Sequence, residues 1–430
     1  MLKEKKNLIW VRLDNAAKIY PAVREKNWSN IFRQSVTLHE KVDVGILKSS
    51  LAIIIKRFPT IAARLRKGLF WYYLQQVESI PEIREEYSYP LVHMSNDEMR
   101  KCAFRVIVHN NRIAVEFFHS LTDGTGALIF LKNLVAEYLE QKYEIEIPLE
   151  HGIINRLEDP KEEELEDCYP KYASKYPLSR KDTTAWNMDG SLEVDNFLHL
   201  TCFKLPVVNC LNLAHQYNST LTVFMSAVMM LALYNLQNEQ NPIIKYQKPI
   251  KVLIPINLRN IFPSKTFRNF AMFTIPELDP RMGEYTLAEL CELVKHKMGL
   301  EFTAKHMSRV LATNVKDEQN PVLRLVPLPI KNMVMKAVYE SVGEKQSCLS
   351  FSNVGKVKVP AIMEKYIERF DFILGVQAAA PYNCGMLSFK DTVYINFIRN
   401  IKEPGLERHF FKVLQSLGLP VTVESNLNER

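Results

Sequence analysis

The fold is decided by the stretch Phe118-His119-Ser120-Leu121-Thr122-Asp123-Gly124. Residues 112–118, which lead into it, alternate between polar and apolar side chains and predict a strand, with His119 at the end of its apolar face. Residues 128–140, which follow it, place apolar side chains at helical spacing. The sequence therefore predicts a histidine at a strand terminus, with an aspartate and a glycine in the turn that opens a helix.

Two interpretations of this stretch stay open. A lone histidine on an apolar face is commonly a packed core residue, and an aspartate before a helix is commonly an N-cap. The string H-x-x-x-D-G, however, arises by chance in a chain of this length in only roughly a few per cent of cases. Its placement between a strand and a helix lowers that share further. We therefore favour a catalytic role for His119 over a purely structural one.

The string resembles the H-x-x-x-D-G signature of the CoA-dependent acyltransferase superfamily. That superfamily includes chloramphenicol acetyltransferase, the BAHD acyltransferases, wax ester synthases, nonribosomal peptide condensation domains and the alcohol acetyltransferases, and the whole chain is most similar to the last group. The resemblance implies an α/β (α+β) fold of two chloramphenicol acetyltransferase-like domains. Their mixed sheets would be flanked by helices, and an active-site tunnel would lie between the domains.

The resemblance also implies roles for individual residues. His119 would be the general base that removes a proton from the acceptor. Asp123 could be a charge partner of His119, but the superfamily pattern implies that it points away, pairs with Arg259 in Pro255-Ile256-Asn257-Leu258-Arg259, and orders the loop. Gly124, which lacks a Cβ, would let the chain turn sharply and let a substrate or a facing strand come close.

Candidates for the oxyanion hole lie in the segment Leu349-Ser350-Phe351-Ser352-Asn353-Val354-Gly355. It resembles the Ser-Asn-x-Gly segment that lines the tunnel of alcohol acetyltransferase-like proteins. Ser352 or Asn353 would then donate to the oxyanion of the tetrahedral intermediate. An ordinary turn at the end of a strand explains the same string equally well.

Composition indicates two globular halves. The chain has 430 residues, 47% apolar and 24% charged, which suits two domains of about 200 residues each. We predict an N-terminal acyltransferase half at 1–150, a linker or crossover at 151–195 and a C-terminal half at 196–430. The acidic run 158–167 is expected to be a solvated stretch, with an acidic partner-binding site as the alternative. The net charge of +7 is too modest to argue for nucleic acid.

The cysteines and the apolar segments bear on location. Seven scattered cysteines without a C-x-x-C pair favour reduced thiols and no metal site. The N-terminus lacks the features of a signal peptide. The uncharged segment 211–236 is interrupted by polar residues, which favours a buried helix over a transmembrane one. We therefore expect a cytoplasmic protein without a transmembrane segment.

The periodicities predict further elements. Strands are expected at 7–13, 28–38, 70–75, 103–108, 198–205, 251–256, 270–275, 348–354, 366–374 and 384–397, the last a hairpin that turns at 390–391. Helices are expected at 44–58, 206–217, from 219 to about 236, 286–311 and 406–417.

The sequence thus predicts an acyltransferase that moves an acyl group, in the first place acetyl, from a CoA thioester to the hydroxyl or amine of a small acceptor. Acyl-CoA would be a co-substrate, with no resident cofactor, and the residues that bind it stay unassigned. The absence of a Gly-rich phosphate loop agrees with the resemblance, which implies that CoA lies along the inter-domain channel. One alternative takes the acyl group from an acyl or peptidyl carrier protein. The other is a non-catalytic binding protein of the same fold.

Overall fold

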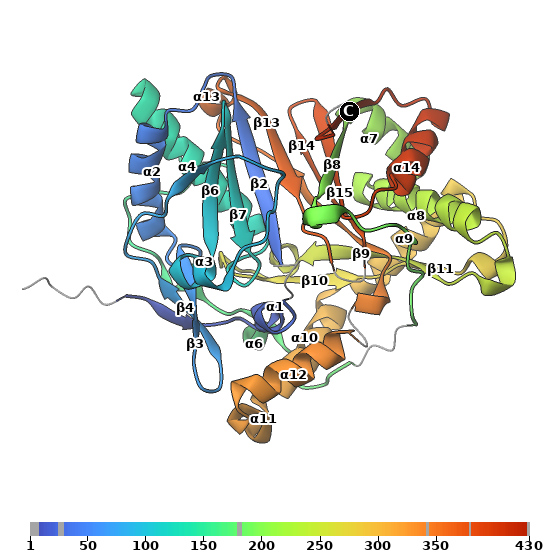
Figure 1. Cartoon of the computed structure of the whole chain (residues 1–430), viewed down its shortest axis with the longest axis horizontal. Helices are drawn as coiled ribbons and strands as arrows, with labels where there is room; N and C mark the ends of the chain where they lie inside the picture. The colour runs from blue at the N-terminus through green and yellow to red at the C-terminus, as the bar shows by residue number, and fades with distance from the viewer. Residues whose placement is uncertain (1–7, 25–29, 179–182, 341–343, 378–379, 428–430) are drawn as a thin grey trace, which may run out of the picture.

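The computed structural model describes residues 8–24, 30–178, 183–340, 344–377 and 380–427. Within these residues the strands form a five-stranded, an eight-stranded and a three-stranded sheet. The two larger sheets stand side by side, each with helices on its outer side (Figure 1). The predicted α/β fold with mixed sheets flanked by helices is confirmed.

The five-stranded sheet forms the N-terminal half, and α2 and α4 cover one face of it (Figure 1). The rings of Phe104 and Phe117, from two neighbouring strands, pack edge-on against Phe130 of α4. This sheet has the strand order β13 (Ile367–Ile373), β2 (Ile31–Leu38), β7 (Arg112–Phe118), β6 (Phe104–His109) and β5 (Ile83–Glu85), and its helices are α2 (Val44–Arg57) and α4 (Gly124–Tyr143).

The eight-stranded sheet forms the C-terminal half, and α7, α8, α9 and α14 lie on its outer side (Figure 1). In order, its strands are β10 (Ala271–Thr274), β9 (Ile250–Asn257), β12 (Leu349–Lys356), β14 (Tyr382–Phe389), β15 (Thr392–Arg399), β8 (His199–Pro206) and β16 (Thr422–Ser425), with β11 (Glu277–Leu278) also paired to β9. The four helices are α7 (Val207–Gln216), α8 (Leu221–Gln240), α9 (Leu287–Glu301) and α14 (Gly405–Ser416).

Smaller elements complete the molecule. The third sheet has the order β1 (Trp10–Arg12), β4 (Tyr72–Gln76) and β3 (Ala63–Lys67). The remaining α-helices are α1 (Ile19–Ala22), α3 (Asn96–Lys101), α5 (Glu162–Leu165), α6 (Tyr169–Tyr172), α10 (Ala304–Gln319), α11 (Pro321–Leu325), α12 (Leu328–Val338) and α13 (Ala361–Glu364).

One strand crosses between the halves. β13 belongs by sequence to the predicted C-terminal half, yet it pairs antiparallel with β2 in the N-terminal sheet. It also lies against β14 and β15 of the C-terminal sheet. Arg369 and Asp371 of β13 form an ion pair, and Asn396 of β15 donates to the same carboxylate. β13 therefore fastens the two sheets to each other, while the domain boundaries stay a prediction.

The single long helix predicted at 286–311 is wrong. The structure has two helices, α9 and α10, which meet at Phe302 and Thr303. The Thr303 hydroxyl accepts from the backbone N–H of His306 and so caps the second helix. A threonine at this position favours a new helix start because its side chain satisfies an N–H that has no partner within the helix.

The acidic run 158–167 is not solvated throughout, so that expectation is wrong in part. Glu164 is buried, and its carboxylate receives both guanidinium nitrogens of Arg57 at 2.6 and 2.7 Å. This bidentate pair ties α5 to the end of α2.

Among the described residues, the helix α8 is long and apolar enough to cross a bilayer, but 67% of its most apolar window is buried inside the molecule. We interpret α8 as a core helix.

Candidate active site

His119 lies directly after β7 and is held between two aromatic rings. Tyr20 of α1 stacks on the imidazole with the ring centroids 4.5 Å apart and the planes at 17°. Phe32 of β2 lies tilted against it at 4.9 Å. The preceding residue, Phe118, is completely buried, whereas His119 keeps part of its surface accessible. The imidazole is thus fixed in orientation, and the residue is not completely enclosed.

Asn269 determines which nitrogen of His119 carries the proton. Its Nδ2 donates to the backbone carbonyl of His119 at 3.0 Å and to Oδ2 of Asp14 at 3.3 Å, so Oδ1 is the atom that faces the ring. That oxygen lies 3.2 Å from Nδ1 of His119. Because an amide oxygen only accepts, Nδ1 must donate and the lone pair is on Nε2. This is the tautomer that a general base needs.

The surroundings keep the imidazole neutral. Burial lowers the pKa of His119 below its ordinary value of 6.5, while the charge of Asp123 and the hydrogen bond that Nδ1 donates to Asn269 act in the opposite direction without restoring it. A histidine with a lowered pKa is unprotonated at pH 7 and can accept a proton. The site therefore presents a ready base, with Nε2 as the accepting atom.

Asp14 holds Asn269 in place by accepting a hydrogen bond from its amide. Its carboxylate is fully buried, accepts from the backbone N–H of Ala17 at 2.8 Å, and lies 3.7 Å from the guanidinium of Arg268. Neither Asp14 nor Asn269 was among the predicted site residues. The one available signal was the polar pair Arg268-Asn269 between two phenylalanines, at the start of a predicted strand.

The Asp123 carboxylate points away from the imidazole of His119, and its two oxygens accept hydrogen bonds from different partners. Oδ1 accepts from the backbone N–H groups of Thr125 at 3.1 Å and Gly126 at 3.0 Å, and so caps α4. Oδ2 accepts from Nη1 of Arg259 at 2.7 Å and from the N–H of Phe270 at 2.8 Å. The structure thus brings Asp123 and Arg259 together, and the same carboxylate is also an N-cap.

Arg259 connects this carboxylate to the segment 266–270. Its guanidinium donates to the carbonyl oxygens of Thr266 at 3.0 Å and Arg268 at 2.6 Å. Thr122, inside the motif, donates its hydroxyl to the carbonyl of Phe267 at 2.6 Å. Segment 266–270 of the C-terminal half is therefore bonded to Thr122 and Asp123, and through Asn269 to His119. These bonds hold the motif 118–124 in place from the C-terminal half.

Gly124 of the motif and Gly126, two residues further on, allow two close approaches. A Cβ on Gly124 would lie 3.0 Å from Cγ1 of Val354, so β12 comes close there, as expected. The tighter contact is at Gly126, where a Cβ would lie 2.3 Å from the carbonyl oxygen of Phe267 and 2.1 Å from Oγ1 of Thr122. Neither glycine has a positive φ. Both are needed for close packing and not for an unusual backbone conformation.

Replacing Gly126 by alanine should destabilise the protein by about 2 kcal/mol or more, because the new methyl group meets a backbone carbonyl that cannot move without breaking its bond to Thr122. Urea unfolding followed by circular dichroism measures this. Gly299→Ala is the matched control, since a Cβ there meets nothing within 4 Å and alanine favours the helix. Equal midpoints for Gly126→Ala and the wild type would contradict the close contact.

The two oxyanion candidates differ in their surroundings. Asn353 donates from Nδ2 to the hydroxyl of Thr222 at the start of α8, at 2.9 Å, and its Oδ1 accepts from the N–H of Gly355 at 2.8 Å. Both polar atoms of this amide are therefore already bonded, one to α8 and one within the turn. Ser352 lies two residues before Val354, whose Cγ1 comes close to Gly124, and the register of β12 with β14 shifts between Asn353 and Lys356. Because Asn353 would have to give up its bond to Thr222 in order to donate, Ser352 stays the candidate donor.

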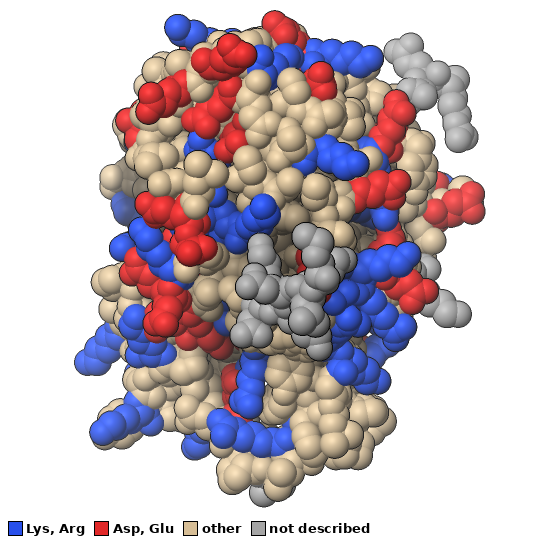
Figure 2. Space-filling view, turned by 90° about the vertical axis from the view of Figure 1, so that its left-hand side faces the viewer, with Lys and Arg blue, Asp and Glu red and all other residues tan. Residues whose placement is uncertain are grey.

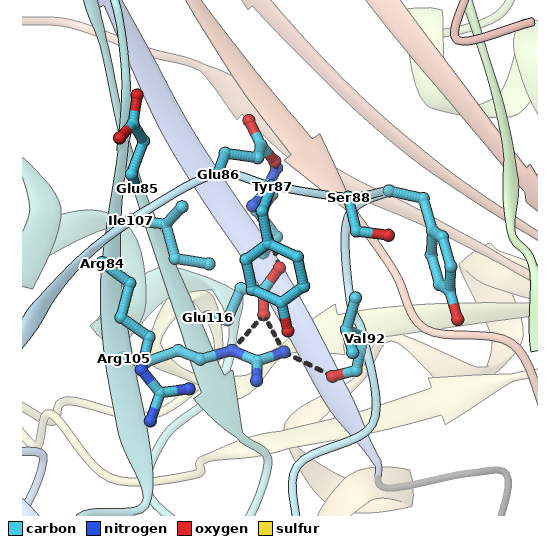
Figure 3. Close-up of a pocket in the computed structure, with 11 residues that line it drawn as sticks. Arg84, Glu85, Glu86, Tyr87, Ser88, Val92, Arg105, Ile107 and Glu116 are labelled. Atoms are coloured by element: carbon cyan, nitrogen blue, oxygen red, sulfur yellow. Dashed lines mark hydrogen bonds and ion pairs between the residues drawn. The ribbon is translucent and has the colours of Figure 1, made fainter.

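A small pocket lies on the face of the N-terminal sheet opposite α4 (Figure 3). Its centre is Glu116, a fully buried residue of β7 that receives Arg33 at 2.9 Å, Arg105 at 2.6 Å and the N–H of Leu91 at 2.7 Å. The cavity, of about 30 Å³, has room for little more than a water molecule. We interpret this cluster as a structural tie between the sheet and the segment that ends at Val92.

Asn269→Ala should lower kcat by about tenfold to a hundredfold, because the imidazole loses the acceptor that fixes its tautomer. The bond to Asn269 raises the pKa of His119, so its loss should also move the acidic limb of the kcat/KM profile to lower pH. Asn133→Ala is the control, a buried asparagine of α4 that donates to the carbonyl oxygens of Ile129 and Gly152. A merely structural Asn269 would leave the pH profile where it is in the wild type.

In the part of the chain that the structure describes, no three His, Cys, Asp or Glu side chains are grouped so that they could hold a metal ion. The seven cysteines are free, and six of them are buried. Burial raises the pKa of the Cys202 thiol to about 12, which leaves it unreactive at neutral pH.

Solved structures share this architecture. The chain is similar to TRI101 from F. graminearum in complex with coenzyme A and T-2 mycotoxin, with 11% identity and a TM-score of 0.63 over 96% of this chain and 99% of that one. Polyketide synthase associated protein 5 from Mycobacterium tuberculosis matches with 12% identity and a TM-score of 0.60 over 94% and 96% of the two chains.

A third similar structure is the first condensation domain of the calcium-dependent antibiotic synthetase, with a substrate analogue. It has 11% identity and a TM-score of 0.59, over 95% of each chain. No protein-family model and no curated protein matches the sequence. At such low identity the likeness establishes the fold alone. The chain has the chloramphenicol acetyltransferase-like fold of trichothecene acetyltransferases and condensation domains, as the H-x-x-x-D-G string predicted.

Proposed function

We propose that this protein is an acyltransferase that moves an acyl group, in the first place acetyl, from a CoA thioester to the hydroxyl or amine of a small acceptor. The observation that carries the proposal is the state of His119. Its Nδ1 donates to Asn269, its lone pair is on Nε2, burial lowers its pKa, and part of the residue stays accessible. A packed core histidine would not need to keep part of its surface accessible.

The reaction would need little else. Nε2 of His119 takes the proton from the acceptor as its oxygen or nitrogen attacks the thioester carbonyl. The carbonyl oxygen becomes negative in the tetrahedral intermediate, where the Ser352 hydroxyl is the candidate donor. When the carbon–sulfur bond breaks, the imidazolium returns the proton to the CoA sulfur. Asp123 and Arg259 would take no part in this proton transfer and would hold the loop that carries the base.

The donor is proposed by likeness of fold. TRI101 was solved with coenzyme A, and it has the same architecture along nearly its whole length. Acyl-CoA would bind here as a co-substrate, although the residues that contact it stay unassigned. The second candidate keeps the chemistry but takes the acyl group from a carrier protein, and it is supported by the fold shared with condensation domains.

For the location of the protein we propose the cytoplasm. The free cysteines, six of which are buried, support this proposal.

The test is release of thiol from acetyl-CoA in the presence of a panel of small alcohols and amines. Turnover with at least one acceptor would support the proposal and identify the acceptor class. If acetyl-CoA and longer acyl-CoAs give no turnover while an acyl-loaded carrier protein does, the donor is the carrier. Absence of transfer from either donor would contradict the proposal and favour a binding protein of this fold.

A further inference from the structure

The helix α12 presents its apolar side to solvent. The six exposed residues among its eleven all have apolar side chains: Pro329, Ile330, Met333, Val334, Ala337 and Val338. Met333 is 67% exposed and Val334 53%. A surface helix of a water-soluble domain normally points its polar residues outward, so this arrangement calls for an apolar partner.

Two polar residues of α12, Lys331 and Asn332, point inward and are already bonded, while Lys336 pairs with Glu340 at the surface. Lys331 is buried, donates to the carbonyl oxygens of Phe70 and Arg324 at 3.1 Å, and lies 3.5 Å above the ring of Trp71. Asn332 donates to the hydroxyl of Tyr72 at 2.9 Å. These contacts fix the helix against the β3–β4 hairpin. The outward direction of the apolar residues is therefore a property of the folded protein.

The neighbouring elements extend the same surface. Leu69, in the turn between β3 and β4, is 71% exposed, and its carbonyl accepts from the N–H of Leu328 at the start of α12. Leu325 of α11 is 72% exposed. Figure 1 shows α11 and α12 projecting at the lower end of the molecule beside this hairpin. We call the exposed apolar residues of α12, together with Leu69 and Leu325, the α12 face.

The charge around the α12 face is mostly positive. Besides the buried Lys331, the hairpin 63–76 and the segment 321–340 carry five cations, Arg64, Arg66, Lys67, Arg324 and Lys336, against the single acid Glu340, which pairs with Lys336. Figure 2 shows the lower end of the molecule mostly tan, with Lys and Arg side chains in a band above the tip. A projecting apolar tip with a basic rim has the composition of a surface that enters the interface of a bilayer with anionic headgroups.

We infer that the α12 face docks the protein on a lipid surface that carries anionic headgroups. Apolar side chains of α12 would enter the headgroup–acyl boundary, and the basic rim would meet the phosphates and carboxylates above it. The inference concerns binding and does not depend on the proposed transferase activity. It has a consequence for that activity, because α12 packs against α1, whose Tyr20 stacks on His119. Docking would bring the membrane close to the base.

The experiment is flotation of the full chain with vesicles of phosphatidylcholine alone or with added phosphatidylserine. We expect binding to the mixed vesicles at low salt, and weaker binding to phosphatidylcholine alone or at high salt. The double variant Met333→Glu, Val334→Glu should bind roughly tenfold less or weaker still. Met282→Glu, Val208→Glu is the matched control, with the same residue types at 80% and 61% exposure elsewhere, and it should bind like the wild type.

Three outcomes would overturn the inference. The first is a wild-type protein that floats with neither vesicle, and the second is an equal loss of binding in the control variant. The third is a wild-type dimer by light scattering that the Met333→Glu, Val334→Glu variant dissociates, which would assign the α12 face to a second copy of this chain. Thermal unfolding of both double variants checks that they are folded. Because the readout is binding, its failure leaves the thiol-release test unaffected.

Discussion

Replacing His119 by alanine should lower kcat by about two to four orders of magnitude, which is the usual contribution of a positioned general base. The structure gives a reason to expect the full effect, because Asn269 holds the ring in the tautomer with its lone pair on Nε2. The acidic limb of the pH profile should also disappear in the variant. In the wild type, kcat/KM should rise with pH through a value below 6.5, since burial lowers the pKa of His119.

A matched histidine separates loss of the base from loss of packing. His199 is also buried, and its Nε2 lies 2.7 Å from Glu193 at a different place in the fold. His199→Ala should keep kcat near the wild-type value, whatever it does to the unfolding midpoint. Thiol release under saturating acceptor, together with circular dichroism of each variant, decides the matter. A His119→Ala protein that is folded and turns over at the wild-type rate would exclude His119 as the base.

Local sequence was enough to predict the element that carries His119. The alternation over 112–118 and the helical spacing after Gly124 each depend on neighbours in the chain, and the structure has β7 and α4 at those places. The hairpin at 390–391 and the helix ending before Pro59 were predicted for the same reason. Each of these features is set by residues within a few positions of one another.

Contacts between distant segments had no such signal. Asn269 is 150 residues from His119, and its role depends on how segment 266–270 is held by Arg259 and Thr122. The pairing of β13 with β2 likewise joins segments from opposite ends of the chain. Arg259 was predicted because the family resemblance implies an arginine that pairs with Asp123. No pattern in the sequence pointed to Asn269 or Asp14. Periodicity alone likewise does not predict which side of α12 packs inward.

Breaking the Asp123–Arg259 pair should cost stability more than any other single change at the site. Both side chains are nearly buried, with 7% and 10% exposed, and removal of one partner from such a pair costs on the order of 3–5 kcal/mol. Arg259→Ala leaves the carboxylate without its counter-charge and frees the carbonyl oxygens of Thr266 and Arg268. Asp123→Ala removes the N-cap of α4 as well, which adds about 1 kcal/mol. Asp123→Ala should therefore be the less stable of the two.

Two control pairs show whether this loss concerns the site. Arg399→Ala breaks the buried pair with Glu407, which joins β15 to α14 in the C-terminal half, and should destabilise the protein while kcat per folded molecule stays normal. Arg281→Ala breaks an exposed pair with Asp279 and should change stability by less than about 1 kcal/mol. Against these, Arg259→Ala should lower both the urea midpoint and kcat, because segment 266–270 carries Asn269 and so positions the base. If Arg259→Ala were as stable and as active as Arg281→Ala, the pair would hold neither the loop nor His119.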